Sequence, residues 1–402
     1  MNSKRHPNTT ALVLSLTLLA TATAAVAAVA EPQSPPWTKK TLPRVASAAT
    51  ADAAIQQGVA WLAAHQGEDG AFSNPQFPGL SGLALWAVAA SGDPAYSNVV
   101  KKGSDFILAK VQPDGGIYTP IPDRKGGGLG TYNTAVCLTA LAATGRDDIT
   151  EVVLNARTYL AASQHLGDDV FKGGFGYDKQ TDRAYTDLMN THFVLEAMRR
   201  TQAYEDRRPA GQKRADLNWQ AALEFAERLH NGPETGDNAG GFYYSPGDAK
   251  AGTEKIAAKP DAPGAATTNE TVVLRSYGSI TYAGLLALVH CDVDRADPRV
   301  QSALNWASRH WTLDENPGMQ DQGLYFFYNV MSRALAAAGL ETIPREQGDA
   351  IPWAKELVGK VVSLRQDDGS WVNRNGRFLE NDSVLATAYS VLALEFATGR
   401  TK

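Results

Sequence analysis

Two acidic residues and one histidine are the clearest candidates for acid–base catalysis: Asp187, His192 and Asp382. A carboxylate with an imidazole nearby can take up and release protons. Asn190 shares the helical face of Asp187 more nearly than His192 does. Asp187 and Asp382 each stand directly before an apolar run, so capping of a helix N-terminus is the competing interpretation. For His192 the alternative is a buried structural histidine.

Aromatic and polar side chains gather at the starts of several apolar segments. Aromatic rings can enclose an apolar chain or stabilise a cation. Arg275 and Arg377 lie near such starts, and helix N-termini also favour anions, so an anion such as a diphosphate is one expected ligand; salt-bridged loops are the alternative. The predicted ligand-binding residues are Tyr132, Asn133, Asn190, Tyr277, Tyr282, Tyr325 and Tyr328.

A short phrase recurs along the chain and indicates a repeat architecture. It consists of a Gln, a few polar residues, a Gly and an aromatic residue. Glycine can adopt the positive φ that a tight turn demands, and the Gln can bond backbone groups at a neighbouring helix end. Clear copies are 66–72, 112–118 and 366–371, and weaker ones are 173–177, 240–243 and 322–325.

Two kinds of helical segment alternate around these phrases. The segments before them carry apolar residues at three- and four-residue spacing, which is typical of an amphipathic helix. They are 51–65, 98–111, 148–164, 215–230, 298–311 and 353–365. The segments after them are apolar all round, which indicates burial on all sides. They are 81–90, 132–144, 188–200, 279–291, 324–338 and 383–398.

This alternation predicts an all-α fold, an α/α toroid. Six αα-hairpins would close into a ring with the apolar helices inside and the amphipathic helices outside. Ser81, Thr131, Asp187 and Asp382 are the expected N-caps of inner helices. Residues 245–273 are polar and rich in Ala, Pro, Gly and Thr, and are expected to form a long surface loop.

At these repeats the chain resembles the terpenoid cyclase and protein prenyltransferase superfamily, in which a squalene-cyclase-like QW motif recurs. Residues 102–107 followed by 112–118 are similar to the long form of that motif, with Tyr118 in place of its Trp, and 360–371 are similar more loosely. Residues 276–284 and 312–318 resemble exported bacterial prenyltransferase and squalene oxidase repeat proteins. The resemblance implies a toroid that binds or transforms an isoprenoid in its central cavity.

The catalytic motifs of that superfamily are not recognisable in the sequence. Arg295 interrupts the nearest approach to an Asp-x-Asp-Asp acid, which begins at Asp292, and an inter-helix loop is the simpler interpretation of these acids. The Asp-x-Cys and His zinc ligands of prenyltransferases are missing, and His290 and Cys291 are adjacent, so they point in different directions. We predict no metal and no cofactor.

The composition and the N-terminal sequence further limit the possible classes of function. The net charge of −5 over 402 residues argues against nucleic-acid binding. Residues 1–30 resemble a signal peptide, with a basic start, an apolar run and an Ala-x-Ala cleavage pattern, although an uncleaved membrane anchor is the alternative. Residues 31–50 are expected to be a linker and 51–400 the toroid. Export to the periplasm or the medium is therefore expected.

Three functions stay open on the sequence. The first is an exported cyclase- or prenyltransferase-like protein that binds or transforms an isoprenoid or another apolar ligand. The second is a non-catalytic scaffold or binding protein of the cell envelope, with an envelope protein as partner. The third is a carbohydrate hydrolase or lyase, which would need paired carboxylates such as Asp187 and Asp382 across a cleft.

Overall fold

A computed structural model describes residues 48–122, 128–179, 184–257 and 270–401. The chain divides into two compact units, 1–34 and 35–402, and every described residue belongs to the second. The predicted signal peptide and most of the predicted linker lie outside the described residues, so both stay predictions. The first described helix begins at Ala48, inside the expected linker.

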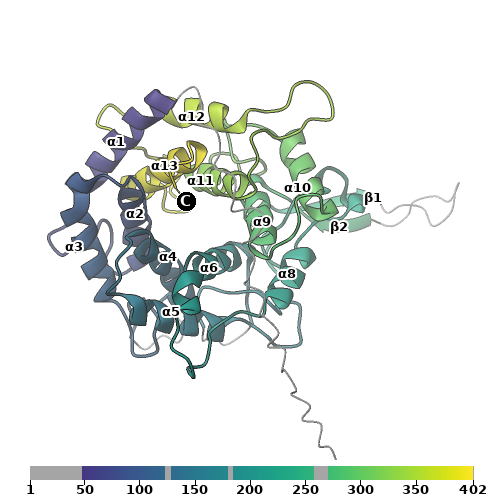
Figure 1. The fold of residues 1–402 in the computed structure, drawn as a ribbon. Helices are drawn as coiled ribbons and strands as arrows, with labels where there is room; N and C mark the ends of the chain where they lie inside the picture. The colour runs from purple at the N-terminus through teal and green to yellow at the C-terminus, as the bar shows by residue number, and fades with distance from the viewer. Residues whose placement is uncertain (1–47, 123–127, 180–183, 258–269, 402) are drawn as a thin grey trace, which may run out of the picture. The chain divides into compact units, whose positions relative to one another are not determined.

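Helix pairs form two concentric rings in the second unit (Figure 1). The inner helices of the described residues are α2 (Pro78–Ala90), α4 (Gly130–Ala143), α6 (Leu188–Arg200), α9 (Gly278–His290), α11 (Leu324–Ala337) and α13 (Ser383–Ala397). The outer helices are α1 (Ala48–Ala64), α3 (Ser97–Leu108), α5 (Thr150–Ser163), α8 (Trp219–Arg228), α10 (Pro298–Arg309) and α12 (Trp353–Ser363). Each inner helix packs against the next, and α13 packs against α2, which closes the ring. The predicted all-α toroid is confirmed.

Burial explains why the two rings have different sequences. In α2 every residue from Pro78 to Val88 is buried, because other helices surround it. In α10 the buried residues Val300, Ala303, Leu304 and Ala307 recur at three- and four-residue spacing, so only one face is covered.

The glycine of the repeated phrase allows close approach to the next outer helix. Gly240 has a φ of +89°, and a Cβ there would lie 2.3 Å from the Ser302 carbonyl oxygen of α10. Gly369 does the same at the closure of the ring, where its added Cβ would lie 3.0 Å from the Gln57 oxygen of α1. Gly70, Gly115 and Gly173 repeat this geometry with carbonyls of α3, α5 and α8.

A hydroxyl group ties each phrase to the inner helix that follows it. The Phe72 N–H donates to Ser81 Oγ at 3.0 Å, and the Trp371 N–H donates to Thr387 Oγ1 at 3.0 Å. The same bond links Ile117 to Thr134, Phe175 to Thr191 and Phe242 to Thr281. Gln164 adds the predicted link to the neighbouring helix, since its Nε2 donates to the Asn218 oxygen at the start of α8.

Several local expectations are wrong. Ser81 and Thr131 lie inside α2 and α4 rather than capping them, because both helices begin earlier than expected. The copy at 322–325 is no turn of the repeat type, since Gly323 is itself the N-cap of α11. Part of the expected loop 245–273 forms an antiparallel hairpin of β1 (Thr253–Ala257) and β2 (Glu270–Leu274). Short helices add α7 (Gln202–Asp206) and two 3-10 turns, Pro94–Tyr96 and Pro233–Asn238.

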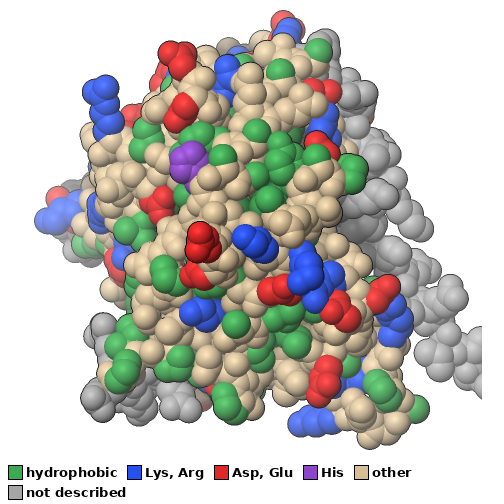
Figure 2. Space-filling model, turned by 90° about the vertical axis from the view of Figure 1, so that its left-hand side faces the viewer, with side chains coloured by type: hydrophobic (Ala, Val, Ile, Leu, Met, Phe, Trp, Pro, Cys, Tyr) green, Lys and Arg blue, Asp and Glu red, His purple; other side chains and the backbone are tan. Residues whose placement is uncertain are grey.

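The surface over α1 and α3 carries mixed charges, with acidic and basic side chains interspersed (Figure 2). Lys101 and Arg146 both pair with Asp105 there, at 2.6 and 3.1 Å. Cys137 and Cys291 are both free thiols. Of the helices in the described part of the chain, none combines the length and the apolar character needed to cross a bilayer.

Substitution of Gly240 by Ala tests the close approach between repeats. Gly211 is the matched control, because its φ of +87° is nearly the same but an added Cβ there would meet nothing within 4 Å. We expect Gly211→Ala to lower the free energy of unfolding by about 1–2 kcal/mol, through backbone strain alone. Gly240→Ala should lower it by roughly 1–3 kcal/mol more, through overpacking. Equal losses by chemical denaturation would contradict this account.

Candidate functional site

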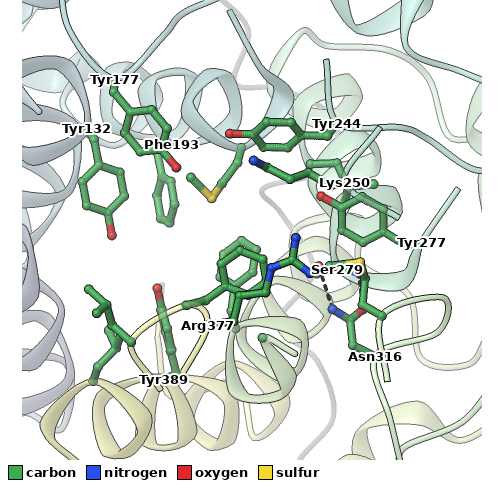
Figure 3. Close-up of a pocket in the computed structure, with 18 of the residues that line it drawn as sticks. Tyr132, Tyr177, Phe193, Tyr244, Lys250, Tyr277, Ser279, Asn316, Arg377 and Tyr389 are labelled. Carbon is green, nitrogen blue, oxygen red and sulfur yellow. Dashed lines mark hydrogen bonds between the residues drawn. The ribbon is translucent and has the colours of Figure 1, made fainter. Parts of the chain in front are cut away.

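A cavity of about 400 Å³ opens where the N-terminal ends of the inner helices meet (Figure 3). Each inner helix contributes at least one wall residue, and the connecting segments supply the rest. The walls consist of Phe77, Leu80, Leu129, Tyr132, Tyr177, Met189, Phe193, Tyr244, Lys250, Tyr277, Ser279, Ile280, Asn316, Met319, Gly323, Phe326, Arg377, Phe378, Leu379, Leu385 and Tyr389. Aromatic and aliphatic side chains therefore dominate, and the described lining includes no carboxylate.

Four rings of the cavity wall pack together, and we call this cluster the floor: Tyr132, Phe193, Phe326 and Tyr389. Phe193 and Tyr389 lie about 8–9 Å along their helices from the first residue, at 1.5 Å per residue. Tyr132 meets Phe193 edge-on with ring centroids 5.5 Å apart, and Phe326 lies 5.7 Å from Tyr389. Such tilted and edge-on contacts are favourable for aromatic pairs and hold the floor in place.

The N-termini of the inner helices are satisfied by the protein itself, largely by the neighbouring sector. Asn133 Oδ1 accepts from the Gly79 N–H of α2 at 2.9 Å, and Asp178 Oδ1 accepts from the Gly130 N–H of α4 at 2.7 Å. Glu380 Oε1 accepts from the Phe326 N–H of α11 at 2.7 Å. The Tyr244 carbonyl oxygen accepts from an N–H in the first turn of α6. In the same way, Asn316 Oδ1 accepts from the first turn of α9 and Asp382 Oδ1 from that of α13. The expected anion site at these helix ends is therefore already occupied by side chains and carbonyls of the protein.

Asp187 is the N-cap of α6 and is fully buried. Its carboxylate accepts from the Asn190 N–H at 2.8 Å and from Asn190 Nδ2 at 2.7 Å, and Tyr244 lies near it. Burial raises its pKa from 3.8 to about 6, although these donors act in the opposite direction. Tyr244 lines the cavity, whereas Asp187 itself does not.

The raised pKa of Asp187 predicts a pH dependence of stability. The folded state holds a proton on Asp187 between pH 3.8 and about 6 that the unfolded state releases, so this stabilisation is lost as the pH rises through 6. Relative to Asp187→Asn, the wild type should lose about 2 kcal/mol of unfolding free energy between roughly pH 4.5 and 7.5. Urea titrations at both pH values measure this difference, and an unchanged difference would contradict the assignment.

Charged side chains lie beneath the floor, inside the inner ring. Arg333 of α11 is buried, forms an ion pair with Glu196 of α6 and donates to Asn329 Oδ1 at 3.1 Å. Its guanidinium packs over the Phe193 ring, 5.2 Å from the ring centroid. Burial lowers the pKa of Arg333 to about 9, so the group stays charged at neutral pH. A positive charge thus backs the aromatic floor.

Comparison with known proteins identifies relatives in fold. The sequence matches no protein-family model and no curated protein. The type II terpene cyclase MstE from Scytonema superposes with a TM-score of 0.51 at 13% identity, over 88% of this chain and 99% of that one. A variant of MstE in complex with the product merosterolic acid A superposes with a TM-score of 0.50 at 12% identity, over 88% of this chain and 98% of that one. The GH76 α-mannanase BT2949 from Bacteroides thetaiotaomicron superposes with a TM-score of 0.50 at 12% identity, over 86% of this chain and 96% of that one.

The fold is an α/α toroid, like those of MstE and BT2949. The resemblance predicted from the repeats is thus confirmed at the level of the fold. A cyclase and a mannanase share this toroid, so the fold alone does not select a reaction.

Some of the predicted site residues line the cavity, and the others form structural contacts elsewhere in the toroid. Tyr132 and Tyr277 line the cavity. Asn133 caps α2 and Asn190 binds Asp187, so both are structural at these contacts. The remaining predicted tyrosines are buried outside the cavity lining: Tyr282 packs against Phe327, Tyr325 donates to the Val372 oxygen and Tyr328 donates to the Leu313 oxygen.

The three predicted catalytic residues lie in different surroundings. Asp187 and Asp382 cap α6 and α13, as the competing interpretation expected. The second carboxylate oxygen of Asp382 accepts from Ser73 Oγ. His192 is fully buried beside Phe193 and Phe326, where desolvation and the charge of Arg333 hold its pKa well below the usual value. None of the three lines the described cavity, and their catalytic roles stay predictions.

Several lining residues were missed because the sequence argument stopped at the first turn of each inner helix. Phe193 and Tyr389 lie one turn after Met189 and Leu385, which also line the cavity. Residues four apart on a helix share a face, so these pairs carried a usable signal. Tyr177, Tyr244 and Lys250 come from connecting segments, whose path the sequence did not indicate.

Two leucines in the cavity wall have strained backbones. Leu129 has a φ of +50° and Leu379 a φ of +62°, a region that costs a branched residue roughly 1–2 kcal/mol. Both side chains line the cavity, and Leu379 is 53% exposed. Strain of this kind concentrates at functional sites.

Relief of this strain should stabilise the protein. Asparagine tolerates positive φ, so Leu379→Asn should raise the free energy of unfolding by about 1 kcal/mol. Leu166→Asn is the matched control, because Leu166 is 52% exposed but does not have a positive φ. Thermal and urea unfolding of both variants measure the difference, and equal effects would show that the Leu379 backbone is not strained.

Proposed function

We propose that the protein binds an isoprenoid, or an apolar molecule of similar shape, in the cavity at the mouth of the inner ring. The observation that carries this proposal is the character of the walls, which are aromatic and aliphatic with few polar groups. A volume of about 400 Å³ is within the range of roughly 300–1,000 Å³ typical of small-molecule sites. Flexible apolar chains gain most of their binding free energy by leaving water for such walls.

Two further observations support this ligand class. The fold relative MstE has been solved with geranylgeranyl dihydroxybenzoate, its substrate, which contains an isoprenoid chain. The strained Leu129 and Leu379 both contribute apolar surface to the wall. Backbone strain at two wall leucines is consistent with selection for a binding surface rather than for stability.

The wall chemistry favours binding over the two reactions known for the fold relatives. Glycoside hydrolysis generally needs two carboxyl groups flanking the substrate, and protonation of an alkene by an aspartic acid needs one carboxyl group at the ligand. Among the described residues that line the cavity there is neither Asp nor Glu. Asp187 and Glu380, which lie near the starts of inner helices, are engaged in capping helices.

Obstruction of the cavity tests the proposal. Leu80 lies in the wall and is 7% exposed, so Leu80→Trp should fill part of the cavity and weaken farnesol binding at least about tenfold. Leu166→Trp makes the same change on the exposed surface and should leave binding unaltered. Equilibrium dialysis with labelled farnesol measures the affinity, and circular dichroism confirms that both variants fold.

Two results would contradict the proposal. One is the absence of saturable binding of farnesol and geranylgeraniol by the wild type. The other is equal binding by the wild type and a folded Leu80→Trp variant, which would place the ligand elsewhere on the protein.

A further inference from the structure

The floor of the cavity carries two hydroxyl groups in otherwise apolar surroundings. Tyr132 of α4 and Tyr389 of α13 line the cavity on either side of α2, and their hydroxyls point toward each other (Figure 3). Even a hydrogen bond between the two hydroxyls would use only one of their two hydrogens, so at least one phenolic hydrogen is left to donate.

The aromatic rings that pack against these tyrosines offer this hydrogen no oxygen or nitrogen acceptor. Phe193 and Phe326 surround the pair at the floor with ring centroids 5.5 and 5.7 Å from Tyr132 and Tyr389. Tyr389 is only 6% exposed, and Tyr132 is partly buried. A donor in such a place needs an acceptor that arrives from the cavity, which is either water or a ligand oxygen.

Arg333 makes this donor stronger. Its guanidinium lies behind Phe193, and its charge acts on both phenols in the direction that lowers their pKa. Burial outweighs this effect and keeps the pKa of Tyr132 raised, at about 12, so the phenol stays protonated at neutral pH. The nearby charge polarises the O–H bond without removing the proton.

We infer that the ligand of this cavity is an isoprenoid with a neutral oxygen at its buried end, such as an alcohol, carbonyl or ether, which accepts a hydrogen bond from the Tyr132–Tyr389 pair. This inference rests on the proposed function and specifies its ligand. A hydrocarbon would leave the phenolic donor without a partner in the dry floor. A carboxylate or phosphate would need several donors to offset its desolvation, and the four rings of the floor offer only the two phenols.

The basic residues of the wall do not change this assignment. Lys250 is paired with Asp248 at 2.8 Å, and Arg377 is an exposed residue bonded to Gln322. Both come from connecting segments rather than from the inner helices that form the floor. The buried end of a ligand therefore meets the tyrosine pair and not these cations.

Competition between farnesol and farnesene tests the inference. The two probes share a chain, and only farnesol carries oxygen. After equilibration with a mixture of both, the ratio of farnesol to farnesene bound is measured by extraction and mass spectrometry. The test compares this ratio between the wild type and the double variant Tyr132→Phe/Tyr389→Phe, so differences in the solubility of the probes cancel.

The ratio should fall roughly three- to tenfold in the double variant, which is the effect of one net hydrogen bond. Tyr96→Phe removes a hydroxyl outside the cavity lining and should leave the ratio unchanged. The single variant Tyr389→Phe should give a smaller decrease, and it serves if the double variant fails to fold. The same ratio in the wild type and the tyrosine variants would overturn the inference while leaving isoprenoid binding intact. Binding of neither probe by the wild type would overturn the proposed function and the inference with it.

Discussion

The toroid depends on satisfying the buried N-terminus of each inner helix. A helix begins with N–H groups that have no partner within the helix, and in this ring those groups face a crowded interior. Neighbouring sectors supply the acceptors, as Asp178 does for α4 and Glu380 for α11. The link between Ser73 and Asp382 continues the same arrangement across the closure of the ring. Each helix hairpin therefore depends on its neighbour for the acceptors that complete its hydrogen bonding.

This capping pattern determines the chemistry of the mouth. Three carboxylates near it are used on helix ends, where the partial positive charge of the helix favours them. Asp187, Glu380 and Asp382 are thereby held in hydrogen bonds to helix N-termini. What remains to line the cavity is mostly the aromatic and aliphatic face of the inner helices. An apolar cavity in a chain with 20% charged residues follows from this division.

The fold was largely predictable, and the site was predictable in part. Amphipathic segments alternate with apolar ones, and a glycine such as Gly240 marks the close approach of a repeat to its neighbour, so the hairpins could be counted from the sequence. Tyr132 and Tyr277 could be placed at the mouth from their position at helix starts. Tyr244 and Lys250 could not, because a connecting segment has no periodicity that shows where it returns. Nor could the sequence show that Asn133 accepts a hydrogen bond from the N-terminus of α2, the inner helix of the preceding sector.

The crystal structure of the protein soaked with farnesol is the most direct test of the central claim. The account predicts continuous electron density for the chain between Leu80, Phe193 and Leu385, with the hydroxyl oxygen within hydrogen-bonding distance of Tyr132 or Tyr389. A cavity that holds only water at saturating farnesol, or a ligand bound outside the ring mouth, would contradict it.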